Sequence, residues 1–262
     1  MDTKEPRTNS VKSLRKAFTI LEELDRCGDL SLAEVSDHLA MDKGTAYRLL
    51  GTMKEAGYVI QNRETKRYSN SLKLFAMGNR VAEATGFREV ARPYIDALSD
   101  KSGETANFGL RTGNSIVYLE KRESKETIRA GLDIGTTVPL YCTGMGKVVL
   151  AYLPEEELAK VLSGMRFRKY TETTVQSKEE LRAQLEVIRK NGYCRDNKEF
   201  VEGLICYAAP VFDYHGYPIG AVSLSIPAYR SDPETPEADR KLSDLVIEAA
   251  NAISRQIGRN EA

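Results

Sequence analysis

The sequence lacks the features that mark membrane, secreted and metal-binding proteins. No apolar run approaches the roughly 20 residues that a membrane span requires, and the opening segment MDTKEPRTNS holds no apolar signal core. Only two histidines are present, and the four cysteines lie far apart without a CxxC pair, which argues against a disulfide framework or a zinc site. We therefore expect a cytoplasmic protein with reduced thiols, no membrane contact and no metal or cofactor.

The sequence also lacks net charge, because 38 Lys and Arg residues balance 38 Asp and Glu residues. This balance excludes a wholly basic nucleic-acid binder and an acidic disordered chain, but it leaves room for a local basic patch. A length of 262 residues with 41% hydrophobic residues is ordinary for a globular protein and predicts roughly two domains.

The N-terminal segment carries the signals of a small helical domain. Apolar residues recur at helical spacing, which predicts helices over residues 11–26, 32–40 and 43–57. Gly28 is expected to end the first helix, Ser31 with Glu34 forms a capping box at the second, and Asp42 can cap the third. The first helix should have one apolar stripe, formed by Leu14, Phe18, Leu21 and Leu24. Two short helices joined by a brief turn are the pattern of a helix-turn-helix.

A β-hairpin is expected after the third helix, because the apolar spacing changes from helical to alternating after Gly57. Its strands cover 58–60 and 66–69, which completes a winged helix-turn-helix. Between Lys43 and Lys73 there are seven basic and two acidic residues, an excess of five that argues against a mere protein-interaction domain. We expect DNA contacts from the start of the third helix and from the wing, namely Lys43, Gly44, Thr45, Tyr47, Arg48, Arg63, Lys66 and Arg67.

The rest of the chain divides into a linker and a larger domain. Residues 71–85 have helical apolar spacing and precede Gly86, so we expect a DNA-binding domain over 1–70, a linker helix over 71–86 and a second domain over 87–262.

The second domain alternates irregularly between strands and helices. Ser177 and Glu180 form another capping box, and a turn signal covers 111–114. Strands are expected at 104–110, 115–121, 127–132, 204–212 and 219–226, and helices up to residue 100, from 146, from 154, over 177–191 and over 236–258. The absence of strict βαβ alternation predicts an α+β domain with a mainly antiparallel sheet.

Three polar groups in this domain could bind a ligand. Residues 143–147 bring glycines to a helix N-terminus, whose free N–H groups favour a carboxylate or phosphate. Residues 195–199 form a polar cluster that, taken alone, is typical of a solvated loop. Ser223 and Ser225 alternate along an apolar strand, so both hydroxyls face the same side and could line a polar pocket.

Cys206 offers an alternative function. A thiol nucleophile with Asp196 as its partner would make the second domain an enzyme. His215 lies in a hairpin turn, too far along the chain for a Cys–His pair, and an enzyme would leave the winged domain unexplained. A cysteine in such a strand is more often a small buried hydrophobe.

The sequence resembles the IclR family of bacterial transcription regulators over essentially all of its length after residue 10. In the N-terminal part, the resemblance rests on LAEVSDHLAMDKGTAYRLLGTMKEAGYVIQN and KRYSNSLKLFAMG. In the second domain it rests on PLYCTGMGKVVLA, DNKEFVEGLICYAAPV and AVSLS. Gly44 stands where members commonly have serine, and Met145 stands where a small residue is common.

This resemblance implies a GAF-like second domain that binds a small organic acid. The implied effector residues are Gly144, Met145, Asp196, Cys206, Ser223 and Ser225. The acid's carboxylate would lie on the amides of 144–146, and the sequence blocks are similar to the sugar-acid branch, so we expect a sugar acid or keto acid. The predicted function is a transcription regulator, a repressor of carbon-source catabolism. It would bind a pseudo-palindromic double-stranded DNA operator as a homodimer or a dimer of dimers.

Overall fold

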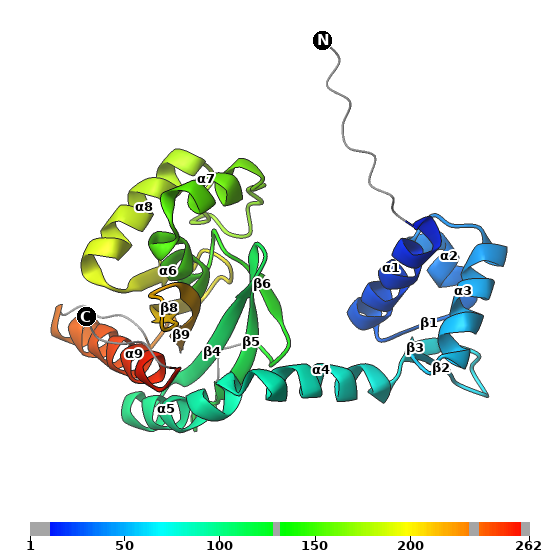
Figure 1. Cartoon of the computed structure of the whole chain (residues 1–262), viewed down its shortest axis with the longest axis horizontal. Coiled ribbons are helices and arrows are strands. Elements are labelled where there is room, and N and C mark those ends of the chain that lie inside the picture. The colour runs from blue at the N-terminus through cyan, green and yellow to red at the C-terminus, as the bar shows by residue number, and fades with distance from the viewer. Residues whose placement is uncertain (1–10, 128–131, 231–235, 258–262) are drawn as a thin grey trace, which may run out of the picture. The chain divides into compact units, whose positions relative to one another are not determined.

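The computed structural model describes residues 11–127, 132–230 and 236–257 (Figure 1). The chain divides into two compact units, with the boundary between residues 84 and 85. Each unit has its own buried apolar residues. None of the helices in the described ranges is both long enough and apolar enough to cross a membrane.

The first unit packs three helices against a small antiparallel sheet. In chain order its elements are α1 (Lys12–Cys27), β1 (Asp29–Leu30), α2 (Leu32–His38), α3 (Lys43–Glu55), β2 (Val59–Gln61) and β3 (Tyr68–Asn70). The strand order is β1-β3-β2, with β2 and β3 forming the wing. The core gathers side chains from α1, α2 and α3, among them Ile20, Leu24, Val35, Ala46 and Leu50. This arrangement confirms the predicted winged helix-turn-helix.

Side-chain caps fix where the helices of this unit begin. The Ser31 hydroxyl accepts the Glu34 N–H at 3.3 Å, and the Glu34 carboxylate accepts the Ser31 N–H at 2.7 Å, so the predicted capping box is present. The Asp42 carboxylate accepts the Thr45 N–H at 2.8 Å at the start of α3. These bonds satisfy N–H groups that the first turn of a helix leaves free.

Two helices of this unit leave apolar side chains exposed. Leu24 is buried, but Leu14 and Phe18, which the spacing places on the same stripe of α1, are 52% and 54% exposed. Helix α4 (Leu72–Thr85), which follows the wing, has no buried residue, and its Phe75 is 71% exposed. The apolar spacing of α1 therefore covers two surfaces, of which only one belongs to the core.

The second unit is a six-stranded antiparallel sheet between two helical layers (Figure 1). Its strands are β4 (Thr105–Thr112), β5 (Ser115–Arg122), β6 (Thr137–Pro139), β7 (Cys194–Asn197), β8 (Leu204–Phe212) and β9 (Pro218–Pro227), in the order β6-β5-β4-β9-β8-β7. One face packs on α5 (Phe87–Ser102) and α9 (Pro236–Ile257). The other packs on α6 (Gly144–Tyr152), α7 (Glu155–Ser163) and α8 (Lys178–Asn191). The predicted α+β class is confirmed.

Helix α6 lies directly on the sheet, and one of its glycines lies against the backbone of the segment that joins β6 to α6. Every residue from Gly144 to Ala151 is buried. A Cβ atom on Gly146 would lie 2.3 Å from the Leu140 carbonyl oxygen, closer than any side chain could be placed. The Thr143 hydroxyl accepts the Gly146 N–H at 3.2 Å and begins the helix. A contact with the sheet is made at Gly144, where an added Cβ atom would lie 3.3 Å from that of Ala208 and 3.5 Å from that of Asp196.

The sequence predicts the long elements but misses the short strands β1, β6 and β7. Residues 194–197 pair with β8 as an edge strand, so the expectation of a solvated loop beginning at 195 is wrong. The strand expected over 127–132 lies largely outside the described residues. At α8 the Ser177 hydroxyl accepts the Glu180 N–H at 3.1 Å, but the Glu180 carboxylate accepts the Gln176 N–H, so this capping box is only half formed.

Gly146→Ala should destabilise the second unit by about 2–3 kcal/mol or more, because its methyl group would overlap the backbone of Leu140. Gly164→Ala is the matched control. Gly164 has a φ of −91°, and a methyl group added there would meet no described atom within 4 Å beyond its chain neighbours, so we expect a change below about 0.5 kcal/mol. Urea denaturation of both variants measures the difference, and equal losses would contradict the packing argument.

Candidate functional site

The first turns of α3 present polar and basic side chains outward. Its opposite face is buried in the core of the unit. Of the five contacts predicted here, Thr45 is half-buried and four are exposed, namely Lys43, Gly44, Tyr47 and Arg48. The structure therefore brings these residues together on one accessible surface.

The wing carries two exposed basic side chains and a third that is held within the unit. Arg63 and Lys66 are exposed in the turn between β2 and β3. Arg67 donates from Nε to the Asp29 carboxylate at 2.8 Å, and its Nη1 lies 3.0 Å from the Glu34 carboxylate. Arg67 therefore ties the wing to β1 and α2, which leaves Arg63 and Lys66 as the free cations of the predicted wing set.

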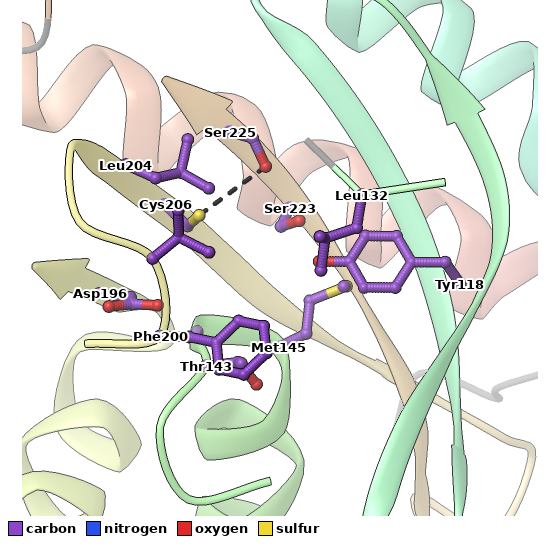
Figure 2. A pocket seen from close by; sticks show the side chains of 12 residues that line it. Tyr118, Leu132, Thr143, Met145, Asp196, Phe200, Leu204, Cys206, Ser223 and Ser225 are labelled. Carbon is purple, nitrogen blue, oxygen red and sulfur yellow. Dashed lines mark hydrogen bonds between the residues drawn. The ribbon is translucent and has the colours of Figure 1, made fainter. Parts of the chain in front are cut away.

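The sheet register aligns polar side chains near the N-terminus of α6 (Figure 2). Cys206 on β8 pairs with Asp196 on β7 and with Ser225 on β9, and the Cys206 Sγ lies 3.7 Å from the Ser225 Oγ. The predicted effector residues all line one cavity of about 430 Å³, counting its solvent-open part: Gly144, Met145, Asp196, Cys206, Ser223 and Ser225.

The rest of the cavity wall is mostly apolar or uncharged. It is formed by Tyr118, Leu132, Thr143, Phe200, Val201 and Leu204. Apart from Thr143, which lies in the glycine-containing segment, sequence reasoning singled out none of these, because no local pattern distinguishes them from ordinary apolar side chains. No Lys, Arg or His side chain is among the described residues that line this cavity.

Asn107 on β4 is a polar residue that sequence reasoning missed. Its side chain is fully buried, and its Nδ2 donates to the Ser225 Oγ at 3.1 Å and to the Ser223 Oγ at 3.4 Å. Its Oδ1 has no hydrogen-bond partner among the described residues. Because Asn107 supplies these donors, the serine hydroxyl hydrogens can point into the cavity. The available signal was a polar residue inside the apolar strand ETANFGL.

The protein's own oxygens already engage the first amides of α6. The Thr143 hydroxyl accepts the Gly146 N–H. A hydrogen bond from the Gly144 N–H to the Asp196 carboxyl opposes the rise that burial causes in the pKa of this group. The Asp196 Oδ1 also accepts the Glu199 N–H at 3.0 Å. An effector carboxylate placed on the amides of 144–146, as the sequence predicts, would therefore lie beside the carboxyl group of Asp196.

Burial dominates the electrostatics of Asp196. It raises the pKa of this carboxyl to about 6, against the opposing influence of the Glu199 N–H and the positive charge of Lys147. Lys147 is itself buried in an ion pair with Glu199, and its Nζ donates to the Gln184 Oε1 at 2.6 Å. The one nearby cation among the described residues is thus neutralised by its own partner.

The geometry does not favour thiol chemistry at Cys206. Burial, and next the charge of Asp196, raises the pKa of this thiol, so the nucleophilic thiolate is disfavoured. His215 lies in the exposed turn after β8 and does not line the cavity. The described residues around Cys206 therefore provide no histidine that could act as a base.

One group of described residues in the first unit has the chemistry of metal ligands. Single ligand atoms of Glu23, Cys27 and His38 lie within 4.8 Å of one another. Hydrogen bonds from Arg26 and then from His38 lower the pKa of Glu23 to about 2. The Arg26 guanidinium therefore already supplies a positive charge to this carboxylate, and the cluster braces α1 against the end of α2.

The first unit has the fold of a winged helix-turn-helix DNA-binding domain, and the second is an α+β unit that contains a polar cavity. The IclR helix-turn-helix domain family matches residues 13–63, and the family described as bacterial transcriptional regulator IclR C-terminal matches residues 79–255. The transcriptional regulator KdgR of Escherichia coli K12 is 38% identical over 256 residues, which are 97% of this chain and 95% of KdgR.

Two further relatives are similar to the chain over most of its length. The transcriptional repressor AllR of Salmonella typhimurium LT2 is 32% identical over 251 residues, 95% of this chain and 90% of AllR. The crystal structure of Thermotoga maritima IclR has a TM-score of 0.73 at 34% identity, and the match covers 94% of this chain and 98% of that one. The chain belongs to the IclR family of bacterial transcriptional regulators. The predicted regulatory function is confirmed, and the alternative of an enzyme that uses Cys206 finds no support.

Asp196→Asn should change how the stability of the protein depends on pH. The folded-state pKa of about 6 lies above the ordinary 3.8, so the folded protein retains a proton that the unfolded chain releases between these values. The wild-type free energy of unfolding should therefore fall relative to that of the variant, by roughly 2–3 kcal/mol between about pH 4 and about pH 8. Urea denaturation across this range measures the difference.

The matched control is Asp244→Asn, which changes an exposed carboxylate on α9. It should leave the wild-type pH dependence in place. A wild-type curve parallel to that of Asp196→Asn would show that the buried carboxyl does not titrate in this window.

Proposed function

We propose that the protein represses genes of a carbon-source pathway, and that a small carboxylate bound in the second unit controls its binding to a pseudo-palindromic operator. The observation that carries this proposal is the combination of an exposed basic surface on the first unit with a polar cavity in the second. Repression is proposed by analogy with AllR, a repressor by name. Because the target is DNA, we place the protein in the cytoplasm.

The proposed DNA surface consists of the start of α3 and the tip of the wing. Arg48 and Tyr47 are exposed where a recognition helix contacts base edges, and Arg63 and Lys66 are exposed where a wing contacts the sugar-phosphate backbone. Between residues 43 and 73 the basic excess of five charges supplies the long-range attraction to phosphates.

Homodimerisation is proposed from the exposed apolar side chains of the first unit. Leu14 and Phe18 on α1, and Leu72, Phe75 and Val81 on α4, are each at least half exposed, which is costly for an isolated chain in water. A single short recognition helix also contacts too few base pairs for useful specificity, whereas two related helices read two half-sites. A second copy of the chain would cover the exposed apolar side chains and supply the second recognition helix.

The proposed effector is a sugar acid or a keto acid held in the cavity of the second unit. The hydroxyls of Ser223 and Ser225 can donate to carboxylate, keto or hydroxyl oxygens, and Thr143 and Asp196 add further polar groups. The effector can regulate DNA binding only if it binds two arrangements of the protein with different affinities. We propose α4, which continues the chain from the wing towards the second unit, as the element whose arrangement changes.

The regulatory proposal is tested with DNA from upstream of the protein's own and neighbouring genes. We expect a sequence-selective, salt-dependent complex, and we expect a sugar acid or keto acid to change its affinity. Electrophoretic mobility shifts with and without each acid measure both effects. Failure to bind any of this DNA selectively would refute the proposal, whereas binding that ignores every acid would refute only the effector part.

Arg48→Ala should weaken operator binding by about 1–3 kcal/mol if its guanidinium reads a base, and nonspecific binding should then change little. A phosphate contact would instead weaken binding to all sequences uniformly. Arg166→Ala, which removes an exposed arginine from the second unit, is the control and should bind like the wild type. Fluorescence anisotropy with operator and unrelated DNA distinguishes these results, and an Arg48→Ala variant with unchanged affinity for both would remove Arg48 from the interface.

A further inference from the structure

The cavity of the second unit contains a carboxyl group without a positive partner among the described residues of its lining. Asp196 is only 4% exposed, and the nearest ammonium group, that of Lys147, is already paired with Glu199. The proposed effector is itself a carboxylate. Its binding would bring two carboxylates together in a site from which water is largely excluded, and their repulsion grows as the local dielectric constant falls.

We propose that the cavity binds its carboxylate effector together with one proton, which Asp196 and the effector share. The inference rests on the proposed function, because it concerns the effector assigned there. Two carboxylates in one site do not both stay ionised at low cost, so one of the pair keeps a proton. The proton comes from solvent, resides on the Asp196 carboxyl and is donated in a hydrogen bond to an effector oxygen, and no covalent bond of the effector breaks.

The groups packed around Asp196 leave it as the natural acceptor of this proton. The titratable groups that face it belong to Tyr118, Cys142, Lys147, Cys194, Glu199 and Cys206. Burial raises the pKa of the tyrosine and of all three thiols, so these four stay neutral, and Lys147 and Glu199 neutralise each other. Burial also raises the pKa of Asp196 to about 6, close enough to neutrality for a second carboxylate to raise it further.

Neutral donors across the sheet can hold the effector's remaining charge. The Oγ atoms of Ser223 and Ser225 accept hydrogen bonds from Asn107, so their hydroxyl hydrogens can be donated to an effector oxygen. One carboxylate oxygen can thus accept from Asp196 and the other from the serines. The same site would bind an uncharged ligand without taking up a proton, which provides a chemical control.

Isothermal titration calorimetry of the full chain with D-gluconate, 2-keto-D-gluconate and pyruvate tests the inference. The association constant of an acid that binds should fall by up to about tenfold per pH unit above about pH 6. The apparent binding enthalpy should also differ between two buffers of different ionisation enthalpy. That difference should correspond to uptake of nearly one proton per site at about pH 7.5 and to much less near pH 5.

Three controls isolate the role of Asp196. D-gluconamide, which lacks the carboxylate, should lose no affinity as the pH rises. Asp196→Asn should abolish both the proton uptake and the fall in affinity, because its amide cannot titrate. Asp244→Asn should retain both. If Asp196→Asn does not fold, the comparison of buffers with the wild-type protein still decides the question.

The possible outcomes separate this inference from the proposed function. An acid that binds at about pH 7.5 without proton uptake would overturn the inference and leave the effector assignment in place. If none of the three acids binds at either pH, in protein that still shifts operator DNA, both the sugar-acid or keto-acid assignment and the inference are overturned. The proposal of DNA binding would survive either result.

Discussion

The burial of one carboxyl group, that of Asp196, beside the N-terminus of α6 is the constraint on which the cavity depends. A buried carboxyl must be hydrogen-bonded or neutral, and the surrounding fold provides for both. Gly144, whose missing side chain leaves room beside Asp196, brings its N–H group to the carboxyl, while Lys147 on the same helix is neutralised by Glu199. The described lining of the cavity is therefore polar but carries no basic side chain, and this combination bears on which ligands it can hold.

Although the net charge of the chain is zero, charged side chains are arranged differently in the two units. In the first unit, basic side chains such as Arg48 and Arg63 are exposed and unmatched by the few acidic residues between 43 and 73, which suits a polyanionic partner. In the second unit, Asp196 is the titratable carboxyl in the described cavity lining, and beside it Lys147 and Glu199 form a buried ion pair. The first unit thus exposes positive charges on its surface, whereas in the second unit the positive charge beside the cavity is neutralised by a buried partner. This difference fits a division into a DNA-binding part and a part that recognises a small ligand by hydrogen bonds.

The sequence predicts best what is decided by local bonds, such as the cap that Asp42 provides for α3. It predicts less where distant segments decide the outcome. The four residues of β7 have little strand character of their own and become a strand because they pair with β8. Asn107 gains its role from the register between β4 and β9, which no local pattern contains. Spacing marks Leu14 and Phe18 as apolar helix positions, but it does not say whether the unit's own core covers them. The residues alone mark Gly144, Ser223 and Ser225 as polar candidates, and the family resemblance supplies the long-range information that places them with Cys206 in one pocket.

A cavity without a basic side chain among its described lining residues changes what an effector's carboxylate contributes to binding. A partner such as arginine would give every small acid an opposite charge and two parallel charge-assisted hydrogen bonds, whereas a serine hydroxyl donates one hydrogen bond and brings no opposite charge. With Ser223 and Ser225 as the donors, the carboxylate alone does not dominate the binding free energy. The difference in affinity between one acid and another then depends on the rest of the ligand. Each of its polar groups needs a hydrogen-bond partner, because an unmatched buried polar group costs about 1–3 kcal/mol. For the proposed effector, we therefore expect simple acids to make too few contacts in this site, and an acid whose hydroxyl or keto groups are all matched to be bound selectively.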